Sequence, residues 1–256
     1  MKTALIGYTG FVGSNLLRER SFTRRYRSTN IEMITREHFD LVVCAGAPAV
    51  KWKANQDPLT DRASLGRLMA ALERLKTKRF VLISTVDVYG QVNGVDEDCT
   101  PTGATPYGLH RLELERFVAR RFHALIVRLT ALFGPGLKKN AIYDLLNGNQ
   151  VEKIDGRAVF QFYDVRRLWR DIRIAAGAGL PLVHLATEPV SMNEVARSAF
   201  GMQALHHLPG TPPLYDLRTR HAELYGGVNG YICRKERVLA NLAEFVRKQR
   251  ELQQCA

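Results

Sequence analysis

TALIGYTGFVG, residues 3–13, sets three glycines at intervals of three directly behind a short apolar run. This order is typical of a strand, a tight turn and a helix start that hold a dinucleotide. Gly7 would allow the turn, Gly10 would let the backbone approach a pyrophosphate, and Gly13 would let a helix from Ser14 to about Arg20 pack close to the strand. A tight turn without a ligand is the alternative interpretation.

The helix start is the second half of this prediction. Unpaired N–H groups and a partial positive charge gather at the first turn of a helix. We therefore expect Phe11 and Val12, with the three glycines, to contact the cofactor.

Apolar stretches alternate with helical patterns along the rest of the chain. We expect strands at residues 2–6, 24–27, 41–45, 80–83, 125–129 and 182–186, and helices at 59–75, 107–122, 141–146, 192–200 and 235–249. Ser191 would cap the helix at 192–200. The alternation predicts an α/β fold with a Rossmann-type, doubly wound parallel sheet. We expect the Rossmann core at 1–137, with 157–190 returning to it, and a small C-terminal substrate-binding part at 138–156 and 191–256.

Composition narrows the class of protein. The chain has 256 residues, of which 46% are hydrophobic, and its four cysteines form no C-x-x-C pair. This argues against a disulfide framework or a metal site and favours a reducing cytoplasm. No apolar run approaches the length of a membrane span, and a strand beginning at about residue 2 leaves no room for a secretory signal. We expect a cytoplasmic protein without membrane contact.

Charge points to an anionic partner. The formal net charge is +12, which would suit a nucleotide cofactor, a nucleotide-linked substrate or RNA. The basic residues are dispersed rather than gathered in one block, so nucleic acid is the less favoured partner.

The end of the second strand bears on cofactor choice. An acidic residue there binds the ribose of NAD, whereas arginine favours the phosphate of NADP. Residues 24–30 read RRYRSTN, and no acidic residue precedes Glu32. We therefore expect NADP rather than NAD, with Arg27 and Ser28 at the phosphate; a basic solvated turn is the alternative.

Two further motifs carry chemistry. STVDVYG, residues 84–90, ends an expected strand, so Thr85 lies where parallel sheets bind ligands. YGLHR, residues 107–111, opens an expected helix. With the glycine turn, these motifs resemble the extended short-chain dehydrogenase/reductase family, the NAD(P)-dependent epimerase/dehydratase group. That family has Y-x-x-x-K where this chain has Arg111, and R-x-x-N-x-x-G-P where this chain has Arg128 but Ala131.

The resemblance implies a reaction and the residues that carry it. Tyr107 would be the acid/base, Thr85 would hydrogen-bond the same sugar oxygen and hold it near Tyr107, and Arg111 would be an altered lysine. The end of the third strand, Cys44, Ala45 and Gly46, would pass under the cofactor. The implied function is hydride transfer on a nucleotide-linked sugar by an oxidoreductase or epimerase.

The substrate end is defined less sharply. Family dehydratases carry an Asp-Glu pair after the threonine, but here Val86 precedes Asp87, which disfavours elimination of water. Candidate substrate contacts are Asp87, Lys138, Asn140 and Arg157, the last through a guanidinium suited to a diphosphate. The helices at 59–75 and 107–122 occupy places that form a dimer bundle in the family, so a homodimer is expected.

Two other functions stay open. A catalytically impaired, NADP-binding regulatory protein is favoured by Arg111 and Ala131. An RNA-binding relative is favoured by the net charge of +12.

Overall fold

The computed structural model describes residues 1–254, so Cys255 lies outside the described residues, and it divides the chain into two compact units. The first unit comprises Met1–Gln91, Glu97–Leu129 and Leu168–His184, and the second comprises Val92–Asp96, Thr130–Arg167 and the chain from Leu185 onward. Among residues 1–254, no helix combines the length and apolar character that a membrane span needs.

The unit boundaries differ from the expected ones. The core of the first unit ends at Leu129 rather than at residue 137, because the next strand, β7 (Ala131–Phe133), pairs with β9 (Phe162–Asp164) of the second unit. The segment that returns to the first unit is Leu168–His184, within the expected range of 157–190.

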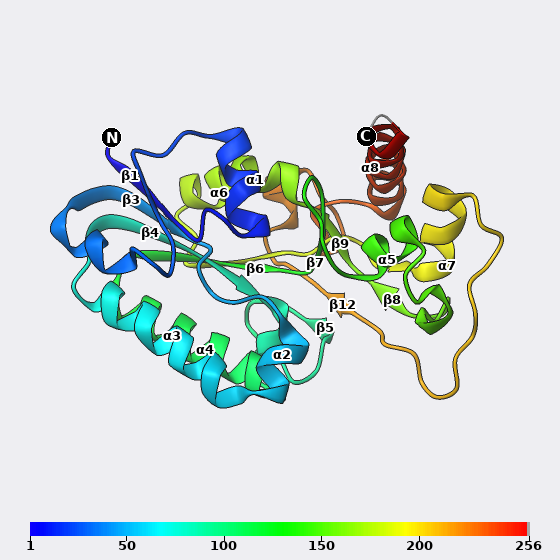
Figure 1. Cartoon of the computed structure of the whole chain (residues 1–256), viewed down its shortest axis with the longest axis horizontal. Helices are drawn as coiled ribbons and strands as arrows, with labels where there is room; N and C mark the ends of the chain where they lie inside the picture. The colour runs from blue at the N-terminus through cyan, green and yellow to red at the C-terminus, as the bar shows by residue number, and fades with distance from the viewer. Residues whose placement is uncertain (255–256) are drawn as a thin grey trace. The chain divides into compact units, whose positions relative to one another are not determined.

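The first unit is built on a six-stranded sheet of order β10-β6-β4-β3-β1-β2 (Figure 1). Its strands are β1 (Thr3–Ile6), β2 (Arg24–Tyr26), β3 (His38–Cys44), β4 (Lys76–Thr85), β6 (Ala124–Leu129) and β10 (Leu182–Leu185). The pairs from β2 through β6 are parallel. The expected doubly wound parallel sheet is thus confirmed. Because β2 and β3 lie on opposite sides of β1, the winding reverses at β1, which is where such sheets bind ligands.

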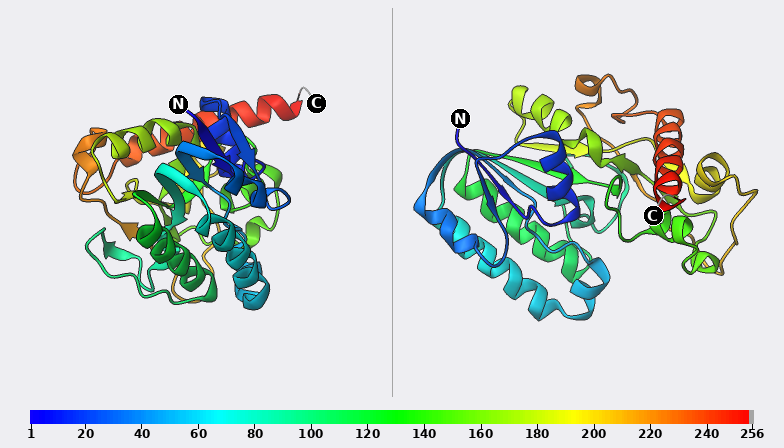
Figure 2. Two further views of the ribbon diagram at one scale, coloured as in Figure 1. Left: turned by 90° about the vertical axis from the view of Figure 1, so that its left-hand side faces the viewer. Right: turned by 45° about the horizontal axis from the view of Figure 1, so that its top comes forward.

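Helices cover both faces of this sheet. They are α1 (Phe11–Glu19), α2 (Lys51–Gln56), α3 (Pro58–Glu73), α4 (Pro106–Arg121) and α6 (Leu168–Gly177). Figure 2 shows α3 and α4 side by side on one face, with α1 and α6 on the other. Leu65, Leu72, Leu114 and Val118 from α3 and α4 are at most 1% exposed and join Phe80 of β4 in one core cluster. Burying each leucine contributes about 1.5–3 kcal/mol.

The second unit is a set of two-stranded sheets with short helices. β7 pairs with β9, β8 (Val159–Phe160) with β11 (Val190–Ser191), and β5 (Asn93–Val95) with β12 (Asp216–Leu217). Its helices are α5 (Ala141–Asn147), α7 (Met192–Val195) and α8 (Lys235–Gln254). Ser191 caps α7 as expected, in a capping box with Glu194. The helix expected at 192–200 changes to π-helical turns at Ala196–Phe200.

Candidate functional site

The glycine turn between β1 and α1 is shaped by close packing. Gly7 has φ of +83°, and a Cβ there would lie 2.3 Å from the carbonyl oxygen of Ala45. A Cβ on Gly13 would lie 2.1 Å from the carbonyl oxygen of Gly7. The helix begins at Phe11 rather than Ser14, because Gly10 is extended and accepts the first helical bond, from Ser14 N–H at 2.9 Å. Gly13 therefore lies in the first helical turn.

Gly10 leaves the start of α1 open. A Cβ on Gly10 would meet only the carbonyl oxygen of Gly7, at an ordinary 3.4 Å. The N–H groups of Phe11, Val12 and Gly13 precede the first helical bond, so they stay available at the positive end of the helix. The turn thus has the donors and the free space that a pyrophosphate needs.

The end of β3 runs beside this turn. Ala45 N–H donates to the carbonyl of Ile6 at 2.9 Å, which ties the end of β3 to the end of β1. Cys44 is fully buried, and burial raises the pKa of its thiol to about 11. A Cβ on Gly46 would lie 2.8 Å from Cγ2 of Ile6. The Cys44 side chain therefore belongs to the core, and Ala45 and Gly46 border the turn through their backbone.

Arg27 and Ser28 follow the end of β2 directly. Gly7 N–H donates to the carbonyl of Tyr26 at 2.8 Å, so the glycine turn and the end of β2 are adjacent. Both residues are exposed, and Arg27 Nε donates to Thr29 Oγ1 at 2.9 Å. The basic side chain thus stands beside the turn.

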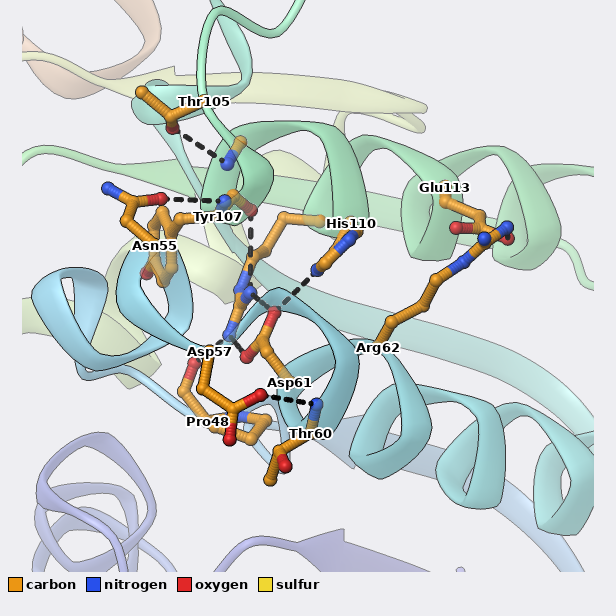
Figure 3. A network of polar contacts seen from close by, with 12 residues as sticks. Pro48, Asn55, Asp57, Thr60, Asp61, Arg62, Thr105, Tyr107, His110 and Glu113 are labelled. Atoms are coloured by element: carbon orange, nitrogen blue, oxygen red, sulfur yellow. Dashed lines mark hydrogen bonds and ion pairs between the residues drawn. The ribbon is translucent and has the colours of Figure 1, made fainter.

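Thr85 and Tyr107 meet at the carboxyl end of β4. Thr85 is the last residue of β4, Tyr107 lies in the first turn of α4, and the Thr85 hydroxyl lies close enough to the phenol to lower its pKa. Asn55 Oδ1 accepts from Tyr107 N–H at 3.0 Å, which fixes the helix start against α2 (Figure 3). A Cβ on Gly108 would lie 2.2 Å from the carbonyl oxygen of Asp87, so α4 packs tightly on the 3-10 turn Val86–Val88.

The surroundings of Tyr107 disfavour its ionised form. Its side chain is 8% exposed, and burial raises its pKa. The charge of Arg111 opposes this rise, that of Asp87 adds to it, and Lys51 and the Thr85 hydroxyl oppose it; the balance leaves the pKa above its ordinary value. A base at this position therefore needs further positive charge nearby.

The two terminal nitrogens of the Arg111 guanidinium have partners away from the Tyr107 hydroxyl, whereas its buried Nε has no hydrogen-bond partner among the described residues. Its guanidinium pairs with both oxygens of Asp61, with Nη2 and Oδ1 2.8 Å apart, and donates to the carbonyl of Pro48. Its Cζ lies 4.0 Å from the centroid of the Tyr107 ring. His110 Nδ1 lies 2.7 Å from Asp61 Oδ2, a contact drawn as a dashed line in Figure 3. Arg111 thus joins α3 to α4 beneath the ring.

Lys51 is a second cation near Tyr107, and no sequence pattern indicates it. Lys51 Nζ lies 2.7 Å from Asp87 Oδ1, and Asp87 Oδ2 lies 3.4 Å from Thr85 Oγ1. The sequence predicts Asp87 as a substrate contact but indicates neither its partner Lys51 nor Asp61. Nothing in the sequence marks them, since each pairs across more than 30 positions.

Arg128, the arginine of the family motif, is buried on β6 and belongs to a network that holds the carboxyl end of β4. Its guanidinium reaches Glu115, at 2.6 Å from Nη2 to Oε2, and the hydroxyl of Tyr89, at 2.6 Å from Nη1. Ser84 Oγ donates to Glu115 Oε1 at 2.5 Å. Burial lowers the pKa of Arg128, but the Glu115 hydrogen bonds outweigh it and raise the pKa overall. This network fixes Ser84, and with it the neighbouring Thr85.

The remaining candidates, Lys138, Asn140 and Arg157, belong to the second unit. Asn140 caps α5 and donates to the carbonyl of Leu132 at 2.8 Å. Arg157 pairs with Asp155, with Nη2 and Oδ2 2.7 Å apart, and also donates to the carbonyl of Leu208. Lys138 is exposed. Asn140 and Arg157 therefore have separate structural partners within this unit.

Comparisons with known proteins agree on one group. The family model described as the NAD dependent epimerase/dehydratase family matches residues 21–171, a stretch that leaves out the glycine turn. No curated protein matches the sequence.

Solved structures of similar fold cover nearly the whole chain. A UDP-glucuronic acid 4-epimerase from Bacillus cereus, in complex with UDP-glucuronic acid and NAD, is 18% identical with a TM-score of 0.71 over 97% of this chain and 100% of that chain. A dTDP-4-dehydrorhamnose reductase from Clostridium acetobutylicum is 18% identical with a TM-score of 0.73 over 98% and 100%. RMD from Pseudomonas aeruginosa, complexed with NADPH, is 18% identical with a TM-score of 0.66 over 90% and 93%.

Proposed function

The chain belongs to the NAD dependent epimerase/dehydratase family, and from this premise we propose that it is an NADP-dependent epimerase or reductase of a nucleotide-linked sugar. Tyr107 is the acid/base of the proposed reaction and Thr85 its partner. The proposal is supported by one observation above all: the Thr85 hydroxyl and the Tyr107 phenol lie close together at the carboxyl end of β4, in the sheet that carries the glycine turn.

The proposed chemistry assigns a task to each side chain. When bound, the nicotinamide supplies the hydride acceptor or donor and a positive charge. Tyr107 removes the proton from a sugar hydroxyl as its carbon gives up hydride, and returns a proton when the carbonyl is reduced. Thr85 hydrogen-bonds the same sugar oxygen and holds it beside the phenol.

Arg27 and Ser28 support NADP over NAD. They follow β2 directly, and Arg27 is an exposed cation next to the glycine turn. A 2′-phosphate suits a guanidinium, whereas the ribose hydroxyl of NAD is usually bound by a carboxylate. Solved structures of this fold hold either NAD or NADPH, so the proposed preference rests on these two residues.

The proposed substrate, a nucleotide-linked sugar, follows from the solved structures that share this fold. The structure from Bacillus cereus contains UDP-glucuronic acid, and the one from Clostridium acetobutylicum is a dTDP-sugar reductase. The proposed substrate contacts in the second unit are Lys138, Asn140 and Arg157. Of these, Lys138 is exposed and Asn140 is partly buried. A catalytically impaired, NADP-binding regulatory protein is the second candidate, favoured by the commitment of Arg111 to Asp61.

Cofactor binding is tested at Gly10. Because a Cβ at Gly10 meets the fold only at an ordinary contact distance, Gly10→Ala is expected to fold normally. The same methyl group would occupy the space proposed for the pyrophosphate, so we expect NADP⁺ affinity to fall by about tenfold or more. Calorimetric titration measures it, with Gly66→Ala as the control, since a Cβ there meets nothing within 4 Å. Equal affinity in both variants would refute the proposed cradle.

Turnover is tested at Tyr107. Wild type and Tyr107→Phe are incubated with NADP⁺ or NAD⁺ and UDP-glucose or UDP-glucuronic acid, and products are separated by ion-exchange chromatography. We expect the phenylalanine variant to bind cofactor and to lose about 10²-fold or more in rate, the range that a positioned acid/base supplies. An active Tyr107→Phe variant would overturn the assignment. Cofactor binding without any reaction in either protein would favour the regulatory alternative.

A further inference from the structure

Tyr107 has two cations near it, and they differ in what they touch. Arg111 lies under the face of the ring and spends its guanidinium on Asp61 and the carbonyl of Pro48. Lys51 instead is joined to the hydroxyl end of the site through polar atoms: Lys51 Nζ to Asp87 Oδ1 at 2.7 Å, and Asp87 Oδ2 to Thr85 Oγ1 at 3.4 Å. Asp87 N–H also donates to Thr85 Oγ1, at 3.1 Å.

We propose that Lys51, through its ion pair with Asp87, is the positioning residue that fixes the Thr85 hydroxyl beside Tyr107 and offsets the Asp87 charge there. The proposal rests on the function proposed above. It assigns to a residue outside the Y-x-x-x-[KR] motif the cation that this chain needs at the hydroxyl end of its tyrosine.

The Asp87 carboxylate is the reason that a cation is needed. It lies two residues beyond Thr85, is 20% exposed as a side chain, and its charge opposes ionisation of Tyr107. An unpaired anion beside a buried phenol raises the phenol pKa, whereas a lysine paired with that anion cancels most of its field. The groups that face Tyr107 are Arg111 from its own helix, Lys51 and Asn55 from α2, and Asp87 and Thr85 from the end of β4.

Exposure separates the two cations further. The Lys51 side chain is 43% exposed and that of Arg111 is 3% exposed. A buried, bidentate guanidinium keeps one position and one charge, because arginine does not lose its proton in proteins. Lys51 Nζ pairs with Asp87, whose side chain is 20% exposed. Lys51 is therefore the cation of the two that solvent and a bound ligand can reach.

A charge-cancelling role makes an unusual prediction about the double variant. Lys51→Ala leaves Asp87 unpaired, so the Tyr107 pKa rises. Asp87→Asn removes the offending charge, so Lys51→Ala with Asp87→Asn returns the Tyr107 pKa to near its wild-type position. Lys51→Arg keeps the charge and stays near wild type. Lys53→Ala is the matched control, because Lys53 lies on the same short helix and carries the same charge.

The experiment is a spectroscopic titration of Tyr107. Phenolate absorbance is followed against pH for each variant, free and saturated with NADP⁺, and the same variant carrying Tyr107→Phe is subtracted to remove the other eight of the nine tyrosines. Circular dichroism at each pH restricts the data to folded protein. We expect the Tyr107 transition in Lys51→Ala to move up in pH by enough to lower the phenolate fraction about tenfold, and to stay unmoved in Lys53→Ala.

Two results would overturn the proposal. One is an unchanged Tyr107 transition in Lys51→Ala; the other is a double variant displaced as far as Lys51→Ala alone. Neither result depends on turnover, so the titration separates this proposal from the proposed function. If the Tyr107 transition shifts in Lys51→Ala but the wild type converts no sugar nucleotide, the role of Lys51 stands and the proposed reaction does not. Where a substrate is turned over, the part of the pH profile in which kcat rises with pH should shift to higher pH together with the Tyr107 transition.

Discussion

Two ion pairs lie near Tyr107, and they are built in opposite ways. Arg111 and Asp61 join α4 to α3 with side chains only 3% and 4% exposed, and His110 and the carbonyl of Pro48 complete the set. Lys51 and Asp87 join through one contact of 2.7 Å, with side chains 43% and 20% exposed. A buried, multiply bonded pair holds architecture, whereas a half-exposed single contact can follow its surroundings at little energetic cost. The motif arginine is therefore expected to serve the fold, and the unmarked lysine the site.

The largest expected effect tests the buried pair. Asp61→Ala leaves the Arg111 guanidinium buried without a carboxylate, so we expect the free energy of unfolding to fall by about 3–5 kcal/mol. Urea unfolding measures it. Asp57→Ala, at the exposed N-cap of the same helix, loses the interactions with the backbone N–H and the side chain of Thr60 and is expected to cost about 1 kcal/mol. Equal losses in the two variants would show that Arg111 and Asp61 are not the stronger link.

The comparison also shows where sequence patterns stop being informative. Local spacing predicts the glycine turn and the alternation of strands and helices, and the parallel sheet is confirmed. The motifs also indicate Thr85 and Tyr107, which lie near each other at the end of β4 and whose roles stay predictions. The partners of Arg111 could not be predicted, because Asp61 lies 50 positions away and resembles any helix-start acid. The strand ends were harder to predict. β4 begins at Lys76 rather than at residue 80, because its first residues are polar and mostly exposed and come before its buried apolar centre.

Restoring the family lysine should sharpen the comparison. Arg111→Lys recreates Y-x-x-x-K, but one ammonium cannot bond both Asp61 oxygens and the Pro48 carbonyl with the geometry of a guanidinium. We expect a loss of about 1–3 kcal/mol in the free energy of unfolding and no gain in the rate with a nucleotide-linked sugar. A more active Arg111→Lys variant would show that the cation needed to ionise Tyr107 belongs at residue 111 rather than at Lys51.

Protonation of Asp61 at acid pH should remove the stabilisation that the Arg111–Asp61 ion pair provides. Burial raises the pKa of Asp61, but hydrogen bonds from Arg111 and His110 outweigh it and hold the pKa below 3.8. A carboxyl with a lowered folded pKa stabilises the protein above its unfolded pKa and loses that stabilisation as pH falls through the folded one. The stability difference between wild type and Asp61→Asn should therefore be constant near neutrality and shrink below about pH 4. Urea midpoints measured from pH 7 to pH 3 test this, and a difference that grows toward acid would contradict it.

The smallest expected effect is the most telling about Lys51. Its pair with Asp87 is a single contact to a half-exposed ammonium, so Lys51→Ala should change the free energy of unfolding by less than about 1 kcal/mol. Added salt should shrink the change further, because exposed charges are screened. A loss as large as that in Asp61→Ala would make Lys51 part of the framework, and its effects on Tyr107 would then follow from a loosened fold. A negligible change in urea midpoint, together with a displaced Tyr107 titration, would separate the two ion pairs: one keeps α3 and α4 together, and the other sets the charge at the phenol.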